Sequence, residues 1–157
     1  MNVANLVKIR ECRPADLDVV TQIEETCFGV AHAIPRICLT QYYDLLGPTF
    51  VVSELSNAAV GFALGGVAYS VDPKLGWLLD VAVLPDYQGY HIGPKLCERV
   101  FQELSKFDVR RIHATVEPEN ERSIRMLRSL EFHMLDDVAD YFGLGQRRLV
   151  MERCEKE

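Results

Sequence analysis

The sequence of 157 residues has no apolar run of about 18 to 20 residues, the length that a helix needs to span a bilayer. Its first residues, MNVANLVKIREC, lack the charged-then-apolar layout of a signal peptide, so we expect a cytoplasmic protein. The five cysteines are odd in number and include no Cys-x-x-Cys pair, which argues against a disulfide framework and against a zinc site. The sequence therefore predicts a globular protein that has no metal centre and does not enter a membrane.

Positive charge is also scarce. Lysine and arginine number 17 against 23 acidic residues, and the net charge of -6 makes nucleic acid an unexpected partner and mildly favours a cationic substrate. A hydrophobic content of 48% with 25% charged residues is typical of a folded soluble protein. The length predicts one domain over residues 1–157, and nothing in the composition decides between a monomer and a homodimer.

The most informative stretch is the segment 78–107. Residues 78–84 form an apolar run that predicts a strand buried on both faces, and the run contains a single carboxylate, Asp80. Pro85 ends the strand, and a helical period of apolar residues begins at Gly93 after a polar loop. The amides at the start of such a helix are free to bind an anion, although an ordinary connecting loop has the same pattern.

Apolar periodicity and breaker residues divide the whole chain into short elements. Helices are predicted at residues 16–28, 35–46, 93–107 and 120–130. Strands are predicted at residues 7–12, 49–54, 60–69, 78–84, 111–116, 132–135 and 147–153. Asp16 is the expected N-cap of the first helix, Ser56 and Asn57 the expected turn of a hairpin, and Gly65-Gly66 the site of a bulge or of a close approach. This order indicates an α+β fold with a parallel strand-helix-strand unit at its centre.

Residues 83–93, VLPDYQGYHIG, resemble the pyrophosphate loop of the GCN5-related N-acetyltransferases (GNAT), V-x-P-x-x-(Q/R)-x-x-G-x-(G/A). Gln88 and Gly93 match this pattern, and His91 stands where the family has its first motif glycine.

A second segment, residues 120–132 with the sequence NERSIRMLRSLEF, resembles the family's N-x-x-A-x-x-L-Y-x-x-x-G-F segment. Its departures are Leu127 in place of the tyrosine and Glu131 in place of the glycine. The two motifs keep the family's order and separation, and the resemblance covers nearly the whole chain.

The resemblance implies a GNAT-like α+β fold, in which a mixed, mostly antiparallel sheet of seven strands has a central parallel pair and about four flanking helices. In that family the central strands splay apart, and the pantetheine arm of acetyl-CoA fills the gap. Acetyl-CoA is thus the implied co-substrate, with no metal. The residues implied to bind it are Val81, Ala82, Val83, Gln88, Gly89, Tyr90, His91, Ile92, Gly93, Pro94, Asn120 and Ser123.

Acetyl transfer to an amine requires a base for the amine and stabilisation of the carbonyl oxygen. Asp80 is a candidate base because burial would raise its pKa toward the working pH, although a strand aspartate can equally face solvent or hold a hydrogen bond. His113 on the neighbouring strand and Glu117 beyond it are further candidates. Leu127 stands where the family has its usual acid, a tyrosine. Tyr141 is the candidate acid instead, although packing of its own loop would also explain this residue.

We therefore expect an acetyl-CoA-dependent N-acetyltransferase that moves an acetyl group to a primary amine by direct attack. The acceptor is a small molecule or a protein N-terminus. Thr115 stands where ribosomal-protein alanine acetyltransferases tend to have glutamate, which counts against that subgroup. In the family, the region of the first two helices lines the acceptor pocket. Here its candidates are Cys27, Phe28, His32, Tyr42 and Tyr43, all of which packing alone would also explain.

Two other functions stay open. A non-catalytic acyl-CoA-binding or regulatory module would accommodate the three motif departures at His91, Leu127 and Glu131. A nucleotide-binding α/β domain would use the loop at Gly89, but the sequence has no Gly-x-Gly-x-x-Gly run.

Overall fold

A seven-stranded sheet in the order β1-β2-β3-β4-β5-β7-β6 forms the centre of the computed structural model, which describes residues 3–156. Residues 1, 2 and 157 of the predicted domain lie outside the described residues. The helices are α1 (Leu17–Phe28), α2 (Arg36–Leu46), α3 (Ile92–Ser105) and α4 (Glu121–Ser129). The strands are β1 (Lys8–Glu11), β2 (Phe50–Leu55), β3 (Ala58–Val67), β4 (Leu75–Val83), β5 (Arg111–Val116), β6 (His133–Val138) and β7 (Arg148–Cys154).

Neighbouring strands are antiparallel except for β4 and β5, which are parallel. This arrangement confirms the predicted α+β fold with its mixed sheet and central parallel pair. No helix in the described part of the chain is long and apolar enough to cross a membrane.

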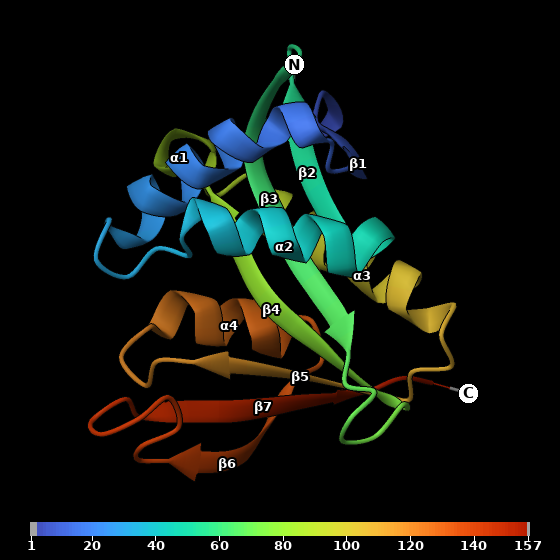
Figure 1. Ribbon diagram of the computed structural model, residues 1–157, viewed down its shortest axis with the longest axis vertical. Coiled ribbons are helices and arrows are strands. Elements are labelled where there is room, and N and C mark those ends of the chain that lie inside the picture. The colour runs from blue at the N-terminus through green and yellow to red at the C-terminus, as the bar shows by residue number, and fades with distance from the viewer. Residues whose placement is uncertain (1–2, 157) are drawn as a thin grey trace.

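Helices cover both faces of the sheet (Figure 1). α1 and α2 lie across β2, β3 and β4 on one face, where Leu39 and Phe62 belong to one buried cluster. α3 and α4 contribute Leu96 and Leu127 to a second buried cluster on the other face. Because apolar helix faces cover them on both sides, β2 and β3 are buried along most of their length.

β4 and β5 pair only where both strands begin. The paired residues are Leu75 with Arg111, Gly76 with Ile112 and Trp77 with His113. In the pairing of β3 with β4, Leu64 lies opposite Asp80. The next residue, Gly65, lies opposite Leu78, which leaves Leu79 as an extra, bulged residue. A bulge bends its strand, and β4 accordingly diverges from β5 toward its C-terminal end (Figure 1).

Gly65 also lies very close to α3. A Cβ atom at this position would come within 2.3 Å of Val100 Cγ1, so a side chain cannot be accommodated without moving the helix. Both alternatives expected for the Gly65-Gly66 pair, a bulge and a close approach, are therefore found together.

Two predicted details of the strands were wrong. β4 is not buried on both faces, because Leu79 is 48% exposed and Asp80 and Val81 are partly exposed where β5 has diverged. β6 continues to Val138 instead of ending at residue 135, and its side chains are mostly exposed because it is an edge strand paired with β7.

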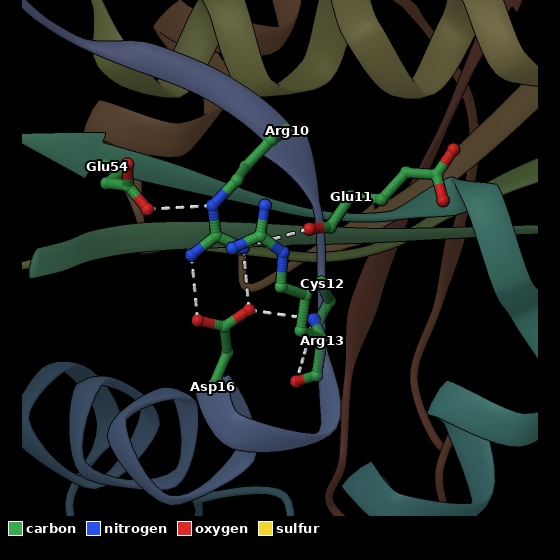
Figure 2. A network of polar contacts seen from close by, with 6 residues as sticks. All are labelled: Arg10, Glu11, Cys12, Arg13, Asp16 and Glu54. Carbon is green, nitrogen blue, oxygen red and sulfur yellow. Dashed lines mark hydrogen bonds and ion pairs between the residues drawn. The ribbon is translucent and has the colours of Figure 1, made fainter. Parts of the chain in front are cut away.

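Asp16 precedes α1, but its side chain does not cap that helix. Its carboxylate instead accepts two hydrogen bonds from the Arg10 guanidinium, at 2.7 and 2.9 Å, and one from the Arg13 N–H at 2.7 Å (Figure 2). Arg10 also donates to Glu54 of β2 at 2.7 Å. The hydrogen bond from Arg10 lowers the pKa of Asp16. This network ties the start of α1 to β1 and β2 and so orients the helix that carries Glu24.

Candidate active site

The segment between β4 and α3 forms one wall of a cavity of about 450 Å³, called here the first cavity. His91 is the residue before α3, and its φ of 59° and ψ of 22° place it in the left-handed conformation. Glycine adopts this conformation most readily, which explains the family's glycine at the position. Ile92 and Gly93 at the N-terminus of α3 line the cavity, so the positive end of the helix dipole is close to it.

The structure brings together all the residues predicted to bind the cofactor except Tyr90. The first cavity is lined by Val81, Ala82, Val83, Gln88, Gly89, His91, Ile92, Gly93, Pro94, Asn120 and Ser123. Tyr90 is 41% exposed and lies outside this lining. Sequence reasoning missed Arg122 and Arg125 of α4, which also line the cavity. Their place in the second motif, three residues apart on one helix face, was the available signal.

Gln88 links the loop to both neighbouring elements. Its Nε2 donates a hydrogen bond of 2.8 Å to the carbonyl oxygen of Val83, and its Oε1 accepts one from the guanidinium of Arg122. The Cys27 thiol donates to the same Val83 oxygen at 3.3 Å. The end of β4 is thus bonded to the loop and to α1 instead of to β5.

A second cavity, of about 860 Å³, adjoins the first where β4 diverges from β5. Six residues line both: Cys27, Phe28, Val81, Asn120, Ser123 and Met126. Of the residues predicted to line an acceptor pocket, Cys27, Phe28, His32 and Tyr42 line the second cavity. Tyr43 instead packs against the core beneath α1 and α2. The two cavities therefore adjoin at the opening between the strands. Arginines line the first cavity, whereas carboxyl groups line the second.

Three carboxyl groups line the second cavity, and two of them, Glu24 from α1 and Asp80 from β4, interact with each other. Glu24 is 2% exposed, and its Oε1 accepts a hydrogen bond of 2.9 Å from the Ile34 N–H. Its buried Oε2 has no N–H or hydroxyl donor among the described residues. Asp80 Oδ1 accepts a hydrogen bond of 2.7 Å from the N–H of Val81.

Burial, the charge of Glu24 and a hydrogen bond to Glu24 raise the pKa of Asp80 well above its ordinary value. Burial also raises the pKa of Glu24. A proton on Asp80 gives Glu24 Oε2 the donor that it otherwise lacks and removes the repulsion between two neighbouring charges. The pair then attracts a cationic amine, and its deprotonated form is a base of raised strength.

Glu24 is a site residue that sequence reasoning missed. It lies on the inward face of α1 together with Leu17, Val20 and Ile23, all of which are buried. A carboxylate on the apolar face of a helix is unusual, because its charge loses hydration on burial, and this was the available signal. Only the structure shows that its partner is Asp80.

His113 lies outside the lining of both cavities. Its Nε2 is 2.8 Å from Glu152 Oε2, and its ring lies edge-on to Trp77 with 5.4 Å between ring centroids. One row of paired residues crosses four strands of the sheet. It runs from Trp77 on β4 through His113 on β5 and Glu152 on β7 to His133 on β6. The structure therefore places His113 in a cross-strand row and not beside Asp80.

The other candidates lie at the margin of the second cavity. Glu117 lines it and forms an ion pair of 3.4 Å with Arg148, which lines it too. Tyr141 does not line it but packs edge-on against Phe142, which does, with 4.7 Å between ring centroids. Burial raises the pKa of Tyr141. Leu127 lines the cavity as a buried side chain without a proton to donate.

Among the described residues, no group of three histidine, cysteine, aspartate or glutamate side chains is arranged to hold a metal ion.

The sequence model of the Acetyltransferase (GNAT) family matches residues 17–132. No curated protein sequence matches the chain significantly. Among solved structures, Ard1 from Thermoplasma volcanium is 18% identical with a TM-score of 0.86, covering 97% of this chain and 99% of that chain.

Two further structures contain a cofactor or its analogue. yncA from Salmonella typhimurium, solved with its cofactor acetyl-CoA, is 26% identical with a TM-score of 0.78 and covers 96% of this chain and 95% of that chain. Arabidopsis thaliana Naa50, solved with the bisubstrate analogue CoA-Ac-MVNAL, is 18% identical with a TM-score of 0.79 and covers 96% and 99%. The family match spans most of the chain, and these structures share its fold over nearly their whole length. The chain therefore belongs to the GNAT acetyltransferase family.

Proposed function

We propose that this protein is an acetyl-CoA-dependent N-acetyltransferase that acetylates a primary amine, either of a small molecule or of a protein N-terminus. The observation that carries the proposal is the position of the Glu24–Asp80 pair. It lines the second cavity, which joins the first across the opening between β4 and β5. A base is thus held beside the compartment in which an activated acetyl group would end.

The residues of the first cavity fit the cofactor. The start of α3 offers backbone amides and a positive dipole for a diphosphate, and His91 has the left-handed backbone conformation that glycine adopts most readily. β4 pairs with β5 only at Leu75, Gly76 and Trp77, so the edge of β4 beyond Trp77 offers backbone groups to an amide-containing arm. Bound acetyl-CoA supplies the acetyl group as an activated thioester.

The chain's own residues handle the protons. The Glu24–Asp80 pair attracts the ammonium form of the acceptor. Once Asp80 has released its own proton to solvent, its carboxylate takes a proton from the ammonium, either directly or through one water. Residues 81–83 line the first cavity, and Val81 lines the second cavity too, so their backbone N–H groups are the proposed donors to the developing oxyanion. Tyr141, which packs against Phe142 at the margin of the second cavity, is the proposed donor to the departing thiolate in place of the tyrosine that Leu127 replaces.

The proposed class of acceptor follows from the charge of the second cavity. A pair that shares one proton carries a net charge of about -1, and Glu117 is balanced by Arg148, so the second cavity favours a monocationic amine. Naa50 was solved with an analogue that joins CoA to a peptide, which supports including peptide N-termini among the candidates.

Free-thiol release from acetyl-CoA in the presence of small amines, amino acid derivatives and peptides tests the proposal. We expect turnover with at least one primary amine and none with the matching tertiary amine. Calorimetric binding of acetyl-CoA without turnover across the panel would favour the non-catalytic acyl-CoA-binding module. Absence of binding, together with binding of a nucleotide, would favour the nucleotide-binding alternative.

A further inference from the structure

The first cavity is positively charged in an acidic protein. The chain has 23 acidic and 17 basic residues, yet no aspartate or glutamate lines this cavity. Two arginines do, Arg122 and Arg125, and both belong to α4. Such a reversal of sign against the net charge is typical of a site that holds an anion.

The two arginines lie on the wall of the first cavity that α4 forms. They are three residues apart, so they share one face of α4, and Met126 and Ser129 on the same helix also line the cavity. α4 is close to the loop here, because a Cβ on Gly93 would lie 3.1 Å from Met126 Sδ. The guanidinium of Arg122 reaches Gln88 Oε1 in the loop itself.

Neither arginine is neutralised by a close acidic partner. Arg122 donates to a neutral amide and has no ion pair among the described residues. Arg125 approaches Glu121 at 3.6 Å, with the two side chains 71% and 82% exposed, and an exposed pair of this kind contributes little. Arg99 of α3, in contrast, is held by the buried Glu103 at 2.9 Å. The α4 arginines therefore remain available to a ligand.

CoA has one more anionic group than the loop amides can hold. Amides at the start of α3 suit its diphosphate, whereas the ribose 3′-phosphate is a separate monoester with a charge of about -2 near pH 7. Planar guanidinium groups bind phosphate oxygens in pairs and are suited to such a monoester.

We propose that Arg122 and Arg125 bind the ribose 3′-phosphate and make the protein selective for CoA over dephospho-CoA. The inference rests on the proposed cofactor site. The amides of the loop hold the diphosphate common to both ligands, and the two arginines hold the phosphate that only CoA carries.

The test is calorimetric titration of the full chain with CoA and with dephospho-CoA at one fixed ionic strength. For the wild-type protein we expect CoA to bind about 10- to 100-fold more tightly, the range for one or two charge-assisted hydrogen bonds. Arg122→Ala and Arg125→Ala should each reduce this ratio, and the double variant should bring it to within about threefold. The affinity for dephospho-CoA should change little.

Arg128→Ala is the matched control, because Arg128 is an exposed arginine of α4 that lines neither cavity. It should retain the wild-type ratio. Equal binding of CoA and dephospho-CoA by the wild type would overturn the inference. An equal loss of affinity for both ligands in the variants would also overturn it, because it would assign the arginines to the diphosphate. Binding of neither ligand would defeat the proposed function itself, and this inference with it.

Discussion

Glu24 on α1 and Asp80 on β4, 56 positions apart in the sequence, meet as a pair of carboxyl groups whose pKa values are both raised. Glu24 is buried by the packing of α1, and Asp80 lines the second cavity where β4 no longer pairs with β5. The pair is therefore a product of the fold. Its raised pKa values lead directly to the first two predictions.

Asp80→Asn should lower turnover by about 100-fold, the usual scale for the loss of a general base. Because the base must be deprotonated, the wild-type rate should rise with pH through the raised pKa of the pair, and the variant should lose that rise. Glu24→Gln removes the neighbouring charge, so it should move the rise to lower pH. His113→Ala is the competing test: near-normal rates for Asp80→Asn with a large loss for His113→Ala would reassign the base.

Asp80→Asn should also change how stability depends on pH. The pKa of Asp80 is raised in the folded protein, so its protonated form contributes stability that is complete below the unfolded value of about 3.9 and is lost as pH rises through the folded value. Asparagine keeps a donor for Glu24 without acquiring a charge. The melting temperature of the variant relative to wild type should therefore increase from pH 5 to pH 9, and parallel melting curves would contradict the raised pKa.

Asn120→Ser should separate two roles of one side chain. Asn120 Oδ1 accepts a hydrogen bond of 3.1 Å from the Ser123 N–H as the N-cap of α4, and the residue lines both cavities. Serine preserves the cap but not the amide, so it should raise the Michaelis constant for acetyl-CoA at nearly unchanged stability. Asn120→Ala should raise that constant and also cost about 1 kcal/mol of stability. Normal cofactor kinetics in the serine variant would remove Asn120 from the site.

His91→Gly should weaken CoA binding. Glycine relieves the left-handed backbone of His91, but it removes an imidazole N–H that can donate a hydrogen bond to a phosphate. We expect the lost hydrogen bond to outweigh the relieved backbone. Calorimetry of wild type and variant measures this. Tighter binding by the glycine variant would show that His91 impairs the site and would favour the non-catalytic alternative.

Glu131→Gly should stabilise the fold. Glu131 follows α4 with a φ of 67°, and its N–H and that of Phe132 donate to Arg128 O and Leu127 O, both at 3.0 Å. Glycine favours this helix end, so we expect a gain of about 0.5 to 1 kcal/mol and a higher melting temperature. Glu131→Ala also removes the exposed carboxylate but keeps the backbone strain. A similar gain in the alanine variant would mean that charge, not conformation, is responsible.

Local sequence patterns predicted the elements well because the causes of those elements are local. Alternation and helical periods determine which residues share a face, and Ser56 and Asn57, with φ of 51° and 65°, form the expected turn. The loop of residues 83–93 was predicted from contiguous residues, and all but Tyr90 of the cofactor candidates within it line the first cavity. The departures at His91 and Glu131 were visible in the sequence, but their shared left-handed conformation was not.

Contacts between distant elements were not predictable in the same way. The Asp16 carboxylate accepts hydrogen bonds from Arg10 and does not cap α1, because the guanidinium from β1 competes for it. His113 is on the expected strand, but register places it opposite Glu152. The Gly65-Gly66 pair indicated a bulge, but not that its extra residue would be Leu79 of β4 or that β4 would leave β5 beyond Trp77.

The sequence by itself thus determined the order of the elements, the α+β class and the loop at the start of α3, because each depends on the periodicity and backbone preferences of neighbouring residues. Only the tertiary structure decided which carboxyl groups come together in the second cavity and which arginines line the first. Proton affinity depends on burial and on charges brought together through space, and neither is defined until α1, β4 and α4 have packed on the sheet.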